Sequence, residues 1–72
     1  MKVSKRDILE IKAGKFKAFT LGSREACNSA RVMCQYVMRS GEMPSNVERY
    51  TTQTDYQTNT IVIYAHKKRE VV

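Results

Sequence analysis

The sequence has little of what most catalytic or metal-binding sites need. Its 72 residues include no tryptophan, one histidine (His66), two cysteines, one proline and three glycines. A single histidine, without a Cys-x-x-Cys pair, supplies too few ligands for a metal site. No acid is evident that could orient a catalytic pair of cysteine and histidine. The glycines form neither a dinucleotide-binding nor a Walker-type phosphate loop. An enzyme is therefore the least expected class, and we expect no metal and no cofactor.

The two cysteines and the apolar runs indicate a compartment. Cys27 and Cys34 are seven residues apart in a segment with a helical pattern, which would separate them by about 10.5 Å, beyond disulfide reach. We therefore expect reduced, buried thiols in a reducing compartment. No apolar run follows the basic start as in a signal peptide, and the longest one, Ile61 to Ala65, is too short to span a bilayer. These features predict a cytoplasmic protein with no membrane partner.

The composition is otherwise that of a folding chain with an excess of positive charge. Hydrophobic residues make up 42%, and thirteen Lys or Arg face seven Asp or Glu, for a formal charge of +6. This length predicts one small domain over residues 1–72, with residues 1–3 and 67–72 as flexible ends. Such a domain buries only about 60% of the surface of its unfolded chain, so a large enclosed cavity is not expected.

Two segments have the signals of helices. Ser4 is placed as an N-cap for a short helix over residues 5–12, which ends at Gly14. Ser23 is placed as the cap of a longer helix that stops at Gly41. The apolar stripe of this longer helix, at helical spacing, consists of Ala26, Cys27, Ala30, Met33, Cys34 and Val37.

Three segments alternate as strands do, over residues 15–21, 48–55 and 60–66, and residues 56–59 form the turn between the last two. The predicted fold class is α+β: a short N-terminal helix, then β-α-β-β, with the last strand in the middle of a three-stranded sheet and the long helix on one face. The other face is open unless the short helix or a second copy of the protein covers it. We expect it to carry Phe16, Ala18, Arg49, Thr51, Val62 and Tyr64.

The positive charge is distributed unevenly along the chain. Residues 1–17 carry six bases and two acids, residues 23–40 three and one, and residues 66–70 three and one, whereas residues 42–55 carry one base and three acids. The acids are scattered along the chain, which suits helix caps, turn residues and solubility charges. They do not form the paired general acid and general base of a catalytic site. Excess positive charge therefore lies at both ends of the chain and on the long helix.

The polar stripe of the long helix contains three arginines and no acid. Its arginines would stand about 10–12 Å apart along the axis, a spacing suited to successive phosphates, and its amides could read base edges. Taken alone, such a stripe is more often only the solvent-facing side of an amphipathic helix. Together with the basic termini it predicts a nucleic-acid-binding protein, with DNA as the expected target. The predicted contacts are Arg24, Asn28, Arg31, Gln35 and Arg39, helped by Lys2, Lys5, Arg6, Lys67, Lys68 and Arg69.

The open sheet face supports a different function. Phe16, Val62 and Tyr64 would form an apolar patch there, which indicates a protein-interaction module that binds a second copy of itself or a host protein. The sequence leaves both functions open.

Three stretches of the chain carry a resemblance. Residues 19–31, with the sequence FTLGSREACNSAR, are followed downstream by Tyr50-Thr51-Thr52 and by residues 59–63, with the sequence NTIVI. In these stretches the chain resembles small uncharacterised proteins of bacterial phages and conjugative elements. The resemblance implies an origin in a mobile element and no activity, and it assigns a role to no residue.

Overall fold

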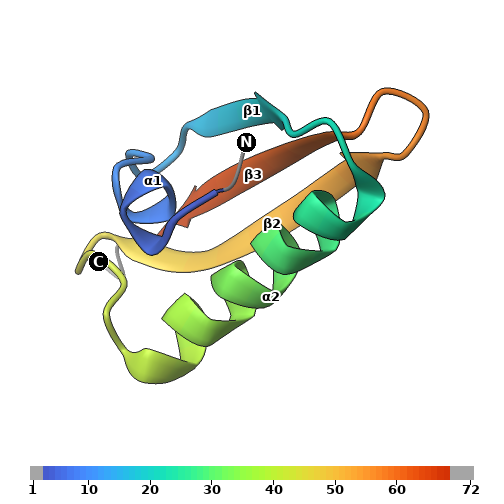
Figure 1. Ribbon diagram of the computed structural model, residues 1–72. Coiled ribbons are helices and arrows are strands. Elements are labelled where there is room, and N and C mark those ends of the chain that lie inside the picture. Colours follow the sequence, from blue (N-terminus) through green and yellow to red (C-terminus); the bar gives the residue numbers. More distant parts are fainter. Residues whose placement is uncertain (1–2, 69–72) are drawn as a thin grey trace.

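The computed structural model describes residues 3–68, which form a sheet with its helices on one side (Figure 1). Its dimensions along the principal axes are 43 × 20 × 15 Å, so the molecule is elongated. The elements in chain order are α1 (Lys5–Leu9), β1 (Phe16–Thr20), α2 (Arg24–Ser40), β2 (Val47–Asp55) and β3 (Thr60–Lys67).

The sheet is antiparallel, and its strand order is β1-β3-β2. The α+β class, the three strands and the helix packed on the sheet are therefore as the sequence predicts. Phe16 of β1 pairs with Tyr64 of β3, which pairs on its other side with Thr51 of β2. Directly paired residues project from the same face of a sheet, so each such row places three side chains side by side.

The first helix is capped as predicted but is shorter. The Ser4 hydroxyl accepts a hydrogen bond from the Asp7 N–H, and the Asp7 carboxylate accepts one from the Ser4 N–H. The helix ends at Leu9 rather than near residue 12, because the chain must turn back to the sheet. Gly14, in the left-handed region at φ 78°, donates its N–H to the Ala65 carbonyl at 2.8 Å. Although Ile11 lies beyond the helix, it is still buried.

The long helix begins and ends where the sequence predicts. The Ser23 hydroxyl accepts the Ala26 N–H at 3.1 Å, and Gly41 ends the helix in the left-handed conformation at φ 72°. Any residue with a Cβ would be strained at that φ. The apolar stripe faces the sheet, and its fully buried members are Cys27, Ala30, Cys34 and Val37.

The strand boundaries differ from the predicted ones by a single residue. β2 begins at Val47, one residue early, and a bulge between Val47 and Arg49 adds Glu48 to the strand. β3 continues through Lys67. The predicted turn at residues 56–59 is present, and its last residue, Asn59, takes a left-handed conformation at φ 51°.

All fourteen buried hydrophobic residues of the described chain belong to one cluster between the helices and one face of the sheet. Val3 and Ile8, from the segment that contains α1, belong to it together with Cys27 of α2 and Ile63 of β3. The short helix therefore lies on the same side of the sheet as α2, and it does not cover the opposite face. No helix within residues 3–68 has the length and apolar character needed to cross a membrane.

Candidate nucleic-acid interface

The predicted helix stripe lies beside β2, and its first half contacts the β2–β3 turn. The Arg24 guanidinium stands 4.6 Å from the centre of the Tyr56 ring, and the Asn28 side-chain oxygen accepts a hydrogen bond of 3.0 Å from the Tyr56 hydroxyl. A cation over an aromatic ring and a hydrogen bond both hold the turn against the start of α2. These two residues therefore have a structural role that the sequence analysis did not foresee.

The second half of the stripe has no such contact. Arg31 and Gln35 line a shallow hollow between α2 and the outer edge of β2, where Thr51 and Thr52 lie opposite them. Arg39 is exposed in the last turn of the helix. Arg31, Gln35 and Arg39 thus remain open to a ligand on the side of the molecule where α2 and β2 meet.

Two predicted phosphate contacts of α1 form ion pairs. The Lys5 ammonium pairs with the Glu42 carboxylate, which raises the pKa of Lys5. The Arg6 Nε atom lies 3.4 Å from the Glu10 carboxylate, one helical turn away. Both pairs are substantially exposed, and exposed pairs of this kind are weak, so a phosphate can compete for either base.

The predicted C-terminal contacts lie only partly within the described residues. Lys67 is the last residue of β3, and the Lys68 N–H donates to the Asn46 carbonyl at 3.1 Å, which ties this segment to the loop before β2. Both side chains are exposed. Lys2 and Arg69 lie outside the described residues.

The fold gathers positive charge at one end of the molecule. The N-terminal segment, the end of α2, the start of β2 and the end of β3 meet there, opposite the β2–β3 turn (Figure 1). Of the described residues, nine bases and four acids lie in this region, which we name the basic end, while the rest of the described chain has two of each. The bases of the basic end are Lys5, Arg6, Lys12, Lys15, Lys17, Arg39, Arg49, Lys67 and Lys68, and its acids are Asp7, Glu10, Glu42 and Glu48.

Neither helix covers the face of the sheet opposite the core, so the short helix is excluded as its cover, and we name it the open face. It is composed of four cross-strand rows, and its polarity changes from one row to the next. At the basic end, Arg49 pairs with His66. The following rows are Phe16, Tyr64 and Thr51, then Ala18, Val62 and Gln53, and finally Thr20, Thr60 and Asp55 at the turn.

An aromatic pair stands next to the row formed by Arg49 and His66 on the open face. The Phe16 and Tyr64 rings have centroids 5.6 Å apart with their planes inclined by 38°. Phe16 is 65% exposed, the largest value among the exposed large hydrophobic residues of the described chain. The His66 Nε2 atom lies 2.7 Å from the Thr51 hydroxyl, a hydrogen bond that orients the imidazole beside the aromatic rings. Aromatic and cationic groups are therefore adjacent on one exposed surface.

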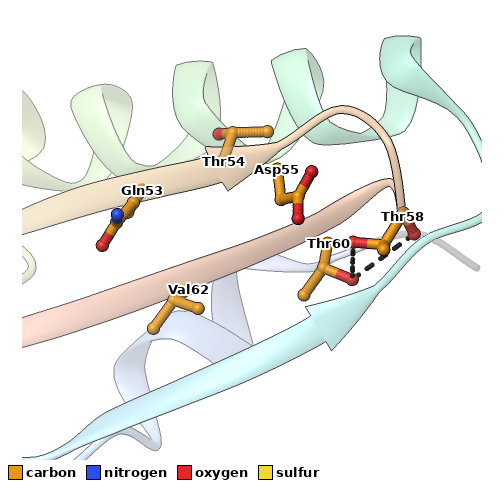
Figure 2. Close-up of a pocket in the computed structure, with 6 residues that line it drawn as sticks. All are labelled: Gln53, Thr54, Asp55, Thr58, Thr60 and Val62. Carbon is orange, nitrogen blue, oxygen red and sulfur yellow. Dashed lines mark hydrogen bonds between the residues drawn. The ribbon is translucent and has the colours of Figure 1, made fainter.

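The hollow at the turn end of the open face has the geometry of a turn rather than that of a ligand site (Figure 2). Thr58 and Thr60 hydroxyls lie 3.0 Å apart, and the Asp55 carboxylate accepts the Gln57 N–H at 2.9 Å. These polar groups therefore satisfy one another. Gln53 and Val62 line the side of the hollow toward the middle of the sheet.

The thiols lie on the helix side of the sheet, in the core. Cys27 and Cys34 are both free and buried, and burial raises the pKa of Cys34 to about 11. A thiol with such a pKa is protonated at neutral pH and is a poor nucleophile. Within residues 3–68, no three side chains of the His, Cys, Asp and Glu types gather closely enough to hold a metal ion.

Comparisons with known proteins add nothing to this geometry. No protein-family model matches the chain, and neither a curated protein nor a solved structure does.

The sequence predicts a protein interface at Phe16, Val62 and Tyr64 and counts His66 with the basic tail. The strand register, which the sequence does not give, places Tyr64 beside Phe16 and His66 beside Arg49 in the next row. Tyr64 and His66 share the period of two along β3, and this was the one available signal that they project from the same face.

Proposed function

We infer that the protein binds nucleic acid, with DNA as the expected target, and that it contacts phosphates mainly through its basic end. It acts as an accessory or regulatory protein of a phage or another mobile element rather than as an enzyme. The observation that carries this proposal is the concentration of nine bases against four acids at one end of a small molecule. A cluster of one sign attracts a polyanion and releases its counterions on binding.

The helix stripe has a smaller part in this function than the sequence analysis gave it. Arg24 and Asn28 support the turn through Tyr56, which leaves Arg31, Gln35 and Arg39 as its free members. Arg39 also belongs to the basic end, because α2 ends there. Binding along the stripe and binding at the basic end therefore differ in which bases contact the phosphates.

A salt series of binding affinity tests the proposal. The full chain is titrated into a fluorescently labelled DNA duplex between 50 and 200 mM salt, and anisotropy gives the affinity at each point. Removing two phosphate contacts lowers the slope of log affinity against log salt by about 1.8 for duplex DNA. We expect this change in the double variant Arg49→Gln, Lys67→Gln, and a smaller one in the matched variant Arg24→Gln, Arg31→Gln.

The series also has results that speak against the proposal. If the wild-type chain shows no binding to DNA or RNA at 50 mM salt, the proposed function is wrong. If the salt slope falls in the variant Arg24→Gln, Arg31→Gln and stays unchanged in the variant Arg49→Gln, Lys67→Gln, the phosphates are bound along α2 and not at the basic end.

A second candidate function is the predicted protein-interaction module. The observation that favours it is the 65% exposure of Phe16 on a face that no helix covers. If a second copy occupies this face, sedimentation equilibrium should show a dimer that Phe16→Asp dissociates. A monomer at all accessible concentrations speaks against self-association.

A further inference from the structure

The aromatic pair of the open face is not explained by the core or by phosphate binding. Phe16 and Tyr64 project away from the helices, and Phe16 leaves 65% of its surface to solvent. A cross-strand aromatic pair stabilises a sheet by about 0.2–1 kcal/mol, but this contribution does not require one of the rings to be left so exposed. Phosphate contacts, in turn, need charges and not rings.

The surroundings of the pair match a polyanion that carries aromatic groups. Arg49 and His66 form the adjacent row toward the basic end. The acid on the same face, Asp55, lies at the opposite end of the sheet, and Glu48 lies in the bulge beside Arg49. The rings therefore stand at the border between the basic end and a neutral surface.

Stacking distinguishes single strands from duplexes. In a duplex each base face is covered by its neighbours, so a ring on a protein surface can reach a base face only where the strand is unpaired. Phosphate attraction alone favours the duplex, which has the higher charge density. A basic surface bordered by accessible aromatic rings has features of proteins that bind single strands, where bases stack on aromatic side chains with little regard to sequence.

We propose that the open face binds single-stranded nucleic acid, with bases stacked on Phe16 and Tyr64 and the adjoining phosphates contacted by Arg49 and His66. This inference rests on the proposed function and adds to it the strand state and the binding face. The pair accommodates about two bases, since rings stack one base each. Preference among bases is weak, because every base offers a flat face to stack on.

The test compares a twelve-nucleotide oligothymidylate with a twelve-base-pair duplex by fluorescence anisotropy at 50 mM salt. Wild type should bind the single strand more tightly. Phe16→Ala and Tyr64→Ala should each weaken that binding by about 5- to 150-fold, the range for loss of one stacked base, and should leave duplex binding and the salt slope unchanged. Phe16→Trp should keep the affinity, because it restores a stacking surface.

Val32→Ala is the matched control. Val32 is 64% exposed, nearly as much as Phe16, but it lies on α2, on the other side of the molecule. Val32→Ala should leave the affinities for the oligothymidylate and for the duplex unchanged. Circular dichroism of each variant verifies that it folds. Because Tyr64 is half-buried, a second variant tests its ring: Tyr64→Phe keeps the ring and should bind the single strand as tightly as wild type does.

Tyrosine emission supplies a second readout, because the chain contains four tyrosines and no tryptophan. Stacking of a base on Tyr64 should quench part of the emission on adding oligothymidylate. In Tyr64→Phe this quenching should disappear while the affinity stays the same.

The outcomes separate this inference from the function on which it rests. If neither probe binds at 50 mM salt, both fail. If both probes bind and Phe16→Ala changes neither affinity, or changes both by the same factor, stacking is overturned while phosphate binding stands. If the chain forms a dimer that Phe16→Ala dissociates, a second copy occupies the face and the inference is overturned.

Discussion

The two faces of the sheet are built from the same strands and differ in what covers them. Along β3, Ile61 and Ile63 on the helix side are completely buried, while Val62 and Tyr64 on the open face are only partly so. The hydrophobic residues of the helix side explain stability, because burial removes their surface from water. Those of the open face gain less from folding, because they stay partly in contact with water. We propose that they contact a ligand instead, whereas the residues of the helix side form the core.

The largest expected effect comes from truncating one residue on each face. Ile63→Ala should lower the free energy of unfolding by about 2–5 kcal/mol, because it leaves a cavity in a core that includes α2. Val62→Ala on the open face should cost less than about 1.5 kcal/mol, because its site is partly solvated already. Urea denaturation of both variants measures the difference. Equal losses would show that something also buries the open face in solution.

Thiol chemistry sharpens the comparison. Cys27 and Cys34 should react with a thiol reagent at pH 8 at least about 100-fold more slowly than a cysteine placed on the open face by Ala18→Cys. Burial shields both native thiols, and a pKa of about 11 leaves Cys34 protonated. Ellman's reagent should detect one fast thiol in the variant and none in the wild type. A fast native thiol would contradict the buried position of α2's apolar stripe.

Two tyrosines on opposite faces provide a smaller contrast. The Tyr50 hydroxyl is buried on the helix side with no hydrogen-bond partner among residues 3–68, and burial raises the pKa of Tyr50. Tyr50→Phe removes a buried polar group that lacks a partner and should stabilise the protein by about 1 kcal/mol. Tyr64→Phe should leave stability unchanged within about 0.5 kcal/mol. Thermal unfolding measures the stability of both variants relative to wild type. A destabilised Tyr50→Phe would show that the hydroxyl has a hydrogen-bond partner in solution.

The smallest expected effect concerns the cap of α1, which closes the helix side at the basic end. Hydrogen bonds from the Ser4 N–H and hydroxyl lower the pKa of Asp7 in the folded state. Its stabilising contribution is therefore present above the unfolded pKa, near 3.9, and is lost as the pH falls through the lower folded pKa. Asp7→Asn should be less stable than wild type at pH 6, and the gap should close toward pH 2. A gap that is independent of pH would mean that the carboxylate's charge does not stabilise the cap.

Much of the fold was predictable because its signals are local. Ser23 and Gly41 mark the ends of α2 through a side-chain cap and a left-handed backbone, and the spacing from Cys27 to Val37 marks its buried stripe. The premature end of α1 at Leu9 was not predictable. The chain after it returns to the sheet, where the Gly14 N–H donates to the Ala65 carbonyl 51 positions away, and local sequence carries no record of such a contact.

The candidate site was less predictable than the fold. The stripe from Arg24 to Arg39 was identified as a surface, but the use of its first half by Tyr56 depends on where the turn folds back. Phe16 and Tyr64 were placed on one face by their alternation, yet their contact depends on register between strands 48 positions apart. Side-chain period is local information, and register is not.

The sequence alone determined the order and approximate bounds of the helices and strands, the alternation of side chains along each strand and a charge of +6. These follow from caps, from apolar spacing and from counting, all of which depend on neighbouring residues. Only the tertiary structure decided that the bases of distant segments meet at one end, and that an aromatic pair stands beside them on the open face. The physical reason is that both arise from hydrogen-bonded pairing of strands far apart in the chain, which places side by side groups that no local pattern connects.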